Sequence, residues 1–257
     1  MSLRVAVCIK QVPVRDWQPR PNDSKTWIVE QDAGFEMNEP DAYALEEALR
    51  LKEKHGGEVV VCTAGPSRVA QVIREALARG ADRAIHVESD ALASADAFTI
   101  AEALAGAVRD EHFDLVLTGL QSDDQGFGQV GVVLAEKLGM PHATIIMEVQ
   151  VVDSGLRVKR ELEGGWFQWM ALPLPALLTI QSGINQLRYA TLKGIMAAKK
   201  KEIRKAAPGS GGEGATRIAG VYFPEKGKKT QMIPGSAAEA AKELVKRLRE
   251  EARVIES

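Results

Sequence analysis

The chain has 257 residues, which is enough for one large domain or for one domain with an appendage. Apolar residues make up 45% of it, and the formal net charge of −2 gives no global reason to expect nucleic acid as a partner. The sequence has no apolar run long enough for membrane insertion and no signal-peptide pattern, and its only cysteines, Cys8 and Cys62, lie in apolar runs, so we expect a cytoplasmic protein with buried thiols.

Strands and helices are predicted to alternate over residues 1–150. The apolar run Leu3–Ile9 is typical of a strand that is buried on both faces, whereas residues 69–77 carry apolar side chains at helical spacing. The same patterns predict strands at 3–9, 27–29, 58–63, 84–87, 115–118 and 143–150, and helices at 40–54, 69–79, 96–109 and 129–138. Asn38 is placed to cap the first helix. This order predicts an α/β fold with a doubly wound parallel sheet.

The pattern changes after residue 150. Short strands are predicted at 156–161, 168–172 and 176–180, and we expect them to form a small antiparallel patch. The stretch Pro208–Gly214 has the composition of a flexible linker, and Ser236 with Glu239 forms a capping box that begins a C-terminal helix. We therefore predict a nucleotide-binding domain at 1–184, an exposed basic loop at 185–205, and a linker with a helix that packs on a partner at 206–257.

Positive charge is concentrated between residues 185 and 205. Seven basic residues face one acid, Glu202, which gives a local charge of +6: Arg188, Lys193, Lys199, Lys200, Lys201, Arg204 and Lys205. Three large apolar side chains, Leu192, Ile195 and Met196, lie among them. This mixture favours docking into an apolar pocket on an acidic protein. Binding to nucleic acid is the competing interpretation, but Tyr189 is the only aromatic residue there for stacking on bases.

The carboxyl ends of the predicted parallel strands indicate where a ligand would bind. They place residues 8–11, 63–65 and 119–128 at one edge of the sheet. The last of these loops continues into Gly126–Gly131, which matches G-x-G-x-x-G, with Glu148 about twenty residues beyond it. Three interpretations remain open: a dinucleotide fingerprint, a phosphate-binding loop at a helix N-terminus, and an ordinary solvated loop. Asp123 and Asp124 would disfavour a phosphate unless their carboxylates turn away from it.

No catalytic site and no metal site emerge from the sequence. The four histidines, His55, His86, His112 and His142, have no metal-ligand spacing with the cysteines. Adjacent carboxylates such as Asp123 and Asp124 could act in acid–base chemistry, but in a loop they more often cap a turn. We therefore expect a binding protein or carrier rather than a hydrolase.

The segment Val158–Thr179 resembles, position by position, the signature of the beta subunits of electron-transfer flavoproteins. Met37–Asn38 with the helix after it and Gly80–Glu88 are similar to further parts of that family, so the resemblance covers nearly the whole chain. It implies a fold like that of the adenine-nucleotide alpha hydrolases. It also implies an electron carrier rather than an enzyme, which forms a heterodimer with an alpha subunit that holds most of the FAD.

The resemblance further implies that the chain binds AMP and docks flavin dehydrogenases, and that the carrier passes electrons to a membrane quinone oxidoreductase. Carried over by position, the AMP contacts are Cys8, Asn38, Glu39, Pro40, Asp41, Ala64, Gly119, Leu120, Gln121, Ser122, Asp123, Asp124, Gln125, Gly126, Phe127, Gly128, Gln129 and Val130. The residues expected to dock the dehydrogenase are Leu192, which matches the exposed leucine of the family's recognition loop, and Arg188, Tyr189, Ile195 and Met196.

The loop Gln121–Gln129 distinguishes two types within this family. It is similar to loops of bacterial members that hold AMP, and it differs from the Asp-Gly-Asp-Thr-type loop of electron-bifurcating members, which hold a second FAD instead. The non-bifurcating type is therefore favoured. A bifurcating complex is one alternative, and a nucleotide-binding regulatory domain that acts alone is another.

Overall fold

The computed structural model of the chain describes residues 2–209, 214–224 and 230–255. These residues fall into two compact units, Met1–Val221 and Tyr222–Ser257. The first unit therefore extends beyond residue 205, where the sequence places the end of the basic loop. No helix in the described ranges has both the length and the apolar character needed to cross a membrane.

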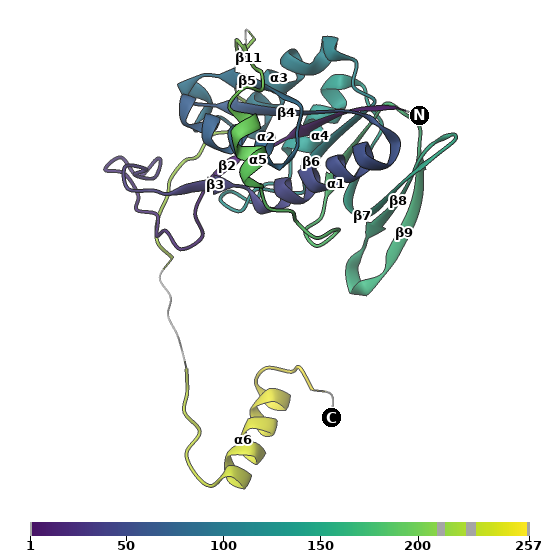
Figure 1. Ribbon diagram of the computed structural model, residues 1–257. Helices are drawn as coiled ribbons and strands as arrows, with labels where there is room; N and C mark the ends of the chain where they lie inside the picture. Colours follow the sequence, from purple (N-terminus) through teal and green to yellow (C-terminus); the bar gives the residue numbers. More distant parts are fainter. Residues whose placement is uncertain (1, 210–213, 225–229, 256–257) are drawn as a thin grey trace. The chain divides into compact units, whose positions relative to one another are not determined.

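Nine strands of the first unit form one sheet (Figure 1). Their order is β11 (Ile203–Ala206), β5 (Arg83–Glu88), β4 (Gly57–Gly65), β1 (Leu3–Cys8), β6 (Leu115–Gly119), β10 (Ala176–Ile180), β7 (His142–Val152), β8 (Gly155–Glu161) and β9 (Phe167–Leu172). Neighbours from β11 to β7 pair in parallel, and β7, β8 and β9 form an antiparallel meander. The predicted α/β fold with a doubly wound, mostly parallel sheet is confirmed.

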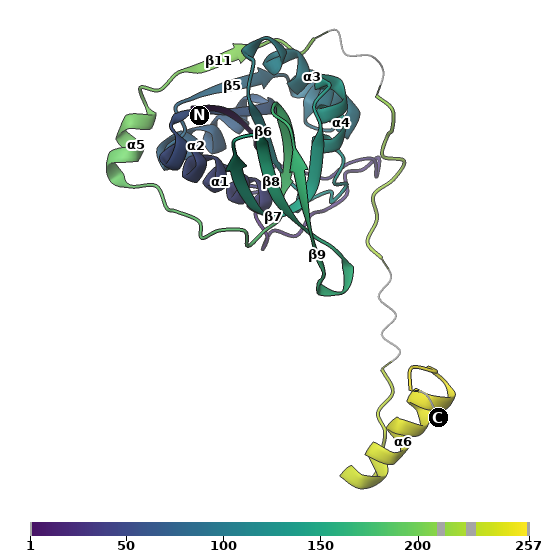
Figure 2. The ribbon, with the colours of Figure 1, turned by 90° about the vertical axis from the view of Figure 1, so that its right-hand side faces the viewer.

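Helices cover both faces of this sheet. The helices of the first unit are α1 (Glu39–His55), α2 (Ala70–Arg79), α3 (Ala97–Val108), α4 (Val130–Leu138) and α5 (Leu192–Ala198), with short 3-10 turns at Ser67–Val69, Asp90–Leu92, Arg109–Glu111 and Glu163–Gly165. Figure 2 shows α1 and α2 on one side of the sheet and α3 and α4 on the other. Successive strand residues point to opposite faces, so Val5 and Val7 pack with α1 and α2 while Ala6 and Cys8 pack with α3 and α4. This two-sided burial explains the continuous apolar runs.

Two strands lie where the sequence does not predict them. Residues 176–180 are expected in the antiparallel patch, but β10 is a central parallel strand between β6 and β7. All five residues of β10 are buried, and a central place in the sheet provides this burial on both faces. Residues 203–206 are expected in an exposed loop, but β11 pairs with β5. Only β8 and β9 of the predicted patch are antiparallel to their neighbours.

The region between β1 and α1 also differs from the prediction. Two short strands, β2 (Gln11–Pro13) and β3 (Phe35–Met37), form a separate antiparallel pair. The predicted strand at 27–29 makes only a single bridge, from Ile28 to Pro21. A polar, proline-rich stretch gives little periodicity from which to find such short strands.

The second unit contains α6 (Ala237–Glu250). Its predicted capping box is confirmed, because the Ser236 side chain accepts from the backbone of Glu239 and the Glu239 side chain accepts in return from the backbone of Ser236. Leu244 and Val245 remain exposed on this helix. The predicted linker falls largely on residues 210–213, which lie outside the described residues.

Candidate functional site

A pocket lies at the carboxyl ends of β1, β4 and β6, the edge of the sheet that the strand order predicts for a ligand. We call it the strand-end pocket. Of the residues predicted to contact a nucleotide, those that line it are Cys8, Asn38, Asp41, Ala64, Gly119, Leu120, Gln121, Ser122, Gln125, Phe127, Gly128, Gln129 and Val130. Glu39, Pro40, Asp123, Asp124 and Gly126 are not among the lining residues.

Asp41 joins three elements beneath the pocket. Its carboxylate accepts a hydrogen bond from the backbone N–H of Lys10 at 2.7 Å, just after β1, and another from that of Gly119 at 2.9 Å, at the end of β6. Asp41 itself lies in the first turn of α1. Burial raises the pKa of this carboxyl group to about 7, even though both N–H donors and the Lys10 ammonium act to lower it.

Asn38 precedes α1, but its side chain does not cap the helix as predicted. The amide nitrogen donates to the backbone oxygen of Gln121 at 3.0 Å, and the amide oxygen accepts from the backbone N–H of Asp123 at 2.9 Å. Asn38 is buried, and these two bonds fasten the loop of residues 120–129 to the start of α1. The loop offers a buried amide both a donor and an acceptor, whereas a cap would use only its oxygen.

The two loop aspartates are turned away from the pocket. The Asp123 carboxylate accepts from the backbone N–H of Glu39 in the first turn of α1. The Asp124 carboxylate accepts from the N–H of Gln125 at 2.8 Å and forms an ion pair with Lys10 at 2.7 Å. Both carboxylates therefore have partners within the chain and neither lines the pocket, so acid–base chemistry on a bound ligand is not favoured.

Two cationic side chains, Lys10 and Arg68, line the pocket, and neither is among the residues predicted to contact a nucleotide. The Lys10 ammonium lies 3.2 Å from the Ser122 hydroxyl and 3.1 Å from the Gln125 amide oxygen. The Arg68 guanidinium donates to the side chains of Gln11 and Glu30 and stacks on the Phe35 ring. Each follows a predicted buried strand within a few residues, which is the signal that could have identified it. The wall formed by Leu92, Ile100 and Leu104 was also not predicted.

The glycines of the G-x-G-x-x-G match have local roles. Gly126 and Gly128 adopt positive φ angles, of 67° and 62°, that favour glycine. A Cβ on Gly131 would lie 2.7 Å from the Thr118 hydroxyl, so this glycine allows α4 to pack closely on the sheet. Glu148 lies opposite Lys159 in the β7–β8 ladder and does not line the pocket. The dinucleotide interpretation therefore lacks its acidic ribose partner.

The pocket combines an apolar wall with groups that attract anions. Val130 and Gly131 begin α4, and a helix N-terminus presents backbone N–H groups and partial positive charge. Lys10 adds an ammonium group, which also pairs with Asp124, and Ile100 and Leu104 supply apolar surface. A ligand with a flat apolar ring and an anionic group, such as a nucleotide, fits this composition.

Replacing Asn38 by alanine should destabilise the chain by about 2 kcal/mol, because the two hydrogen bonds from this buried amide to the loop of residues 120–129 are lost. Urea unfolding of the purified chain measures this change. Asn38→Asp keeps the acceptor for the N–H of Asp123, but it loses the donor to Gln121 and adds a second carboxyl group beside the buried Asp41, so it should destabilise the chain at least as much as alanine does. A free energy of unfolding in Asn38→Ala equal to that of the wild type would contradict the role of the two hydrogen bonds.

A second surface lies in residues 185–205, which we call the basic segment. The side chains of Leu192, Tyr189 and Met196 are among the most exposed large apolar ones, at 76%, 90% and 65%, and Ile195 is exposed at 47%. Arg188 differs from these four, because its guanidinium pairs with the carboxylates of Glu46 and Glu53.

Most cations of the basic segment face the body of the first unit. Arg204 pairs with Glu111, Lys205 pairs with Glu88, and Lys201 donates to backbone oxygens of the body. Within the described residues, Lys193, Lys199 and Lys200 form no ion pair. The outward surface is thus an apolar patch with three lysines around it, and the sequence did not predict this division of the charge.

Comparison with known proteins gives one consistent family. The family model described as electron transfer flavoprotein domain matches residues 25–210. The chain is 35% identical over 261 residues to the electron transfer flavoprotein subunit beta of Methylophilus methylotrophus, covering 96% of this chain and 98% of that protein. It is 38% identical to the subunit beta of Bacillus subtilis (88% and 91% covered) and 37% identical to that of Homo sapiens (98% and 99% covered).

Proposed function

The chain belongs to the electron transfer flavoprotein family, and we propose that it is the beta subunit of a heterodimer whose alpha subunit holds FAD. The observation that carries this proposal is the similarity to beta subunits over nearly the full length of both chains. In this proposal the heterodimer accepts electrons from flavin dehydrogenases and passes them to a membrane quinone oxidoreductase. The bound FAD supplies the redox chemistry, and this chain supplies scaffold and docking surface.

AMP is the ligand that we propose for the strand-end pocket. Lys10 and the first residues of α4 would attract its phosphate, while Leu92, Ile100 and Leu104 offer apolar surface to the adenine ring. Asp123 and Asp124 support this assignment, since their carboxylates are held by Glu39, Gln125 and Lys10 and do not face the pocket. AMP would then act as a structural ligand that fastens three strand ends together.

The nucleotide content of the purified heterodimer tests this assignment. One FAD and one AMP per heterodimer are expected. Two FAD and no AMP would favour the electron-bifurcating alternative. A chain that purifies alone, with no flavin-bearing subunit, would favour the regulatory domain. The loop Gln121–Gln129 supports the first outcome, because it is similar to AMP-holding members of the family.

We propose that the apolar patch of the basic segment docks the dehydrogenase. Leu192, Ile195 and Met196 are exposed on one short helix, and Lys193, Lys199 and Lys200 of the same segment form no ion pair within the described part of the chain. Exposed apolar side chains of this size are suited to insert into a pocket, and the surrounding charge would speed the encounter with an acidic partner. A small contact of this kind suits a transient redox encounter.

Leu192→Ala should raise the KM for partner-dependent flavin reduction about tenfold or more, because an anchoring side chain is removed from the contact. Folding and flavin content should not change, since Leu192 packs little on its own chain. Stopped-flow reduction by the dehydrogenase is the measurement. Val152→Ala, which shortens an exposed side chain in β7, is the control. An unchanged KM in the Leu192 variant would remove the docking role from this residue.

The C-terminal helix α6 is proposed to pack on the alpha subunit. Its residues Leu244 and Val245 form an apolar stripe with Ala241, and none of the helix is buried within the described chain. An amphipathic helix with its apolar face uncovered is suited to a partner surface. Loss of the heterodimer on replacement of Leu244 and Val245 by serine would support this role.

A further inference from the structure

The carboxyl ends of α2 and α5 are each held by a cation, Lys201 just beyond α5 and Arg74 of α2. Arg74 of α2 donates to the backbone oxygens of Ala198, at 2.5 Å, and Lys201, at 3.1 Å, where α5 ends. Lys201 in turn donates to the backbone oxygens of Leu77 and Ala81, where α2 ends. The last carbonyl groups of a helix lack partners within the helix and carry partial negative charge, so a cation stabilises them. We call Arg74 and Lys201 the reciprocal clasp.

The contact between the two helices depends on close approach. A Cβ on Gly194 would lie only 2.2 Å from the backbone oxygen of Ala78, so no larger residue fits at this point without movement of the helix. Ala198 is buried at the other end of α5. A helix of seven residues is too short to be stable in water by itself. The order of α5 therefore comes from its contact with α2.

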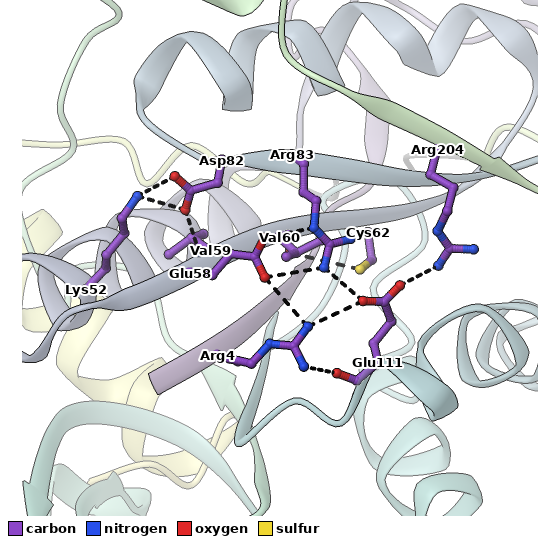
Figure 3. Close-up of polar contacts among 10 residues, drawn as sticks. All are labelled: Arg4, Lys52, Glu58, Val59, Val60, Cys62, Asp82, Arg83, Glu111 and Arg204. Carbon is purple, nitrogen blue, oxygen red and sulfur yellow. Dashed lines mark hydrogen bonds and ion pairs between the residues drawn. The ribbon is translucent and has the colours of Figure 1, made fainter. Parts of the chain in front are cut away.

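Both flanks of α5 are also fixed to the body of the first unit. On the N-terminal side, Arg188 donates to both carboxylate oxygens of Glu46, at 2.7 and 3.0 Å. On the C-terminal side, Arg204 of β11 pairs with Glu111, which also contacts Arg83 and Arg4 in the cluster shown in Figure 3. The inward cations of the basic segment thus hold α5 in place, while its outward side chains remain exposed.

We propose that Arg74 and Lys201 are positioning residues that preorganise α5 for docking of the redox partner. The inference rests on the docking role proposed above for the apolar patch. A surface that is ordered before the encounter loses less conformational entropy on binding. In this proposal the clasp affects affinity through the order of α5, because Arg74 and Lys201 donate to carbonyl groups of their own chain.

Hydrogen exchange of the intact heterodimer tests the clasp directly. Arg74→Gln and Lys201→Gln should speed exchange of the α5 amides about tenfold, while thermal stability changes little. Arg79→Gln is the matched control, because Arg79 is also an arginine of α2 but pairs with Glu75 of the same helix. Lys201→Arg keeps a cationic donor and should retain the protection of α5.

Partner-dependent flavin reduction supplies the second measurement. Both clasp variants should raise KM several-fold with little change in the rate at saturation, whereas Leu192→Ala should raise KM without faster exchange. If exchange and KM in Arg74→Gln and Lys201→Gln match the wild type while Leu192→Ala impairs coupling, the clasp inference is overturned and the docking proposal stands. If Leu192→Ala has no effect, the docking proposal fails.

Discussion

Gly119→Ala is expected to destabilise the chain by about 3 kcal/mol or more and to abolish the proposed binding of a nucleotide in the strand-end pocket. A Cβ at this position would lie 2.4 Å from a carboxylate oxygen of Asp41 and 2.7 Å from the Cβ of Pro40. The φ angle of Gly119 is not positive, so the penalty comes from the clash alone. To relieve it, α1 would have to move away from β6 and break the hydrogen bond from Gly119 to Asp41.

Urea unfolding measures this loss, and Gly106→Ala is its control. Gly106 lies within α3, and a Cβ there meets no atom within 4 Å. Alanine is a better helix former than glycine, so this control should stabilise the chain by about 0.5–1 kcal/mol. The two variants add the same methyl group and should change stability in opposite directions. A Gly119 variant as stable as the wild type would show that the approach of α1 to β6 is not tight.

The second large effect is expected at Asp41, where the stability gap between the wild type and Asp41→Asn should shrink as pH rises from about 4 to about 7. The folded-state pKa of about 7 is above the ordinary value of 3.8. Between these values the folded chain holds a proton that the unfolded chain has released. The stability from protonated Asp41 is therefore complete below about pH 4 and is lost as pH rises to about 7.

Asparagine at position 41 cannot titrate, so it removes this pH dependence. It also replaces one acceptor oxygen by an NH₂ group, which leaves the N–H of either Lys10 or Gly119 without an acceptor, at a cost of about 1–3 kcal/mol. Unfolding of the nucleotide-free chain at several pH values provides the measurement. A gap that widens with pH would mean that the N–H donors and the ammonium of Lys10 outweigh burial, so that the folded-state pKa lies below 3.8.

Gly119 and Asp41 affect the pocket through the same contact. Asp41 joins the end of β1 to the end of β6, and Gly119 leaves the space in which it does so. A pocket formed by the ends of separate strands keeps its shape only if those ends are fixed to one another. For this reason, a loss of nucleotide binding in either variant should accompany the loss of stability.

The fold class could be predicted because it depends on local patterns. Strands buried on both faces, such as Leu3–Cys8, must be almost entirely apolar, and helices that cover a sheet carry an apolar stripe. The capping box at Ser236 was also predictable, since its partners are three residues apart. The pocket edge followed from topology, because the carboxyl ends of parallel strands meet at one edge.

Contacts between residues far apart in the sequence were decided only by the tertiary structure. The apolar run Ala176–Ile180 predicts a strand, but its place between β6 and β7 depends on neighbours that the run does not encode. Asn38 is of a residue type, and in a position, that favours a helix cap. Its side chain nevertheless forms hydrogen bonds with a loop more than eighty residues away. Local sequence constrains backbone conformation, whereas side-chain partners are chosen by the packing of the whole chain.

The basic segment shows the same division. The sequence by itself determined the net charge of +6 in this segment and the presence of Leu192, Ile195 and Met196 among its cations. The structure decided which cations face inward, through carboxylates and carbonyl groups that belong to α1, α2 and β5 and to the turn at Glu111. Charge can be counted from a sequence, but whether it is neutralised depends on which groups the fold brings within hydrogen-bonding distance.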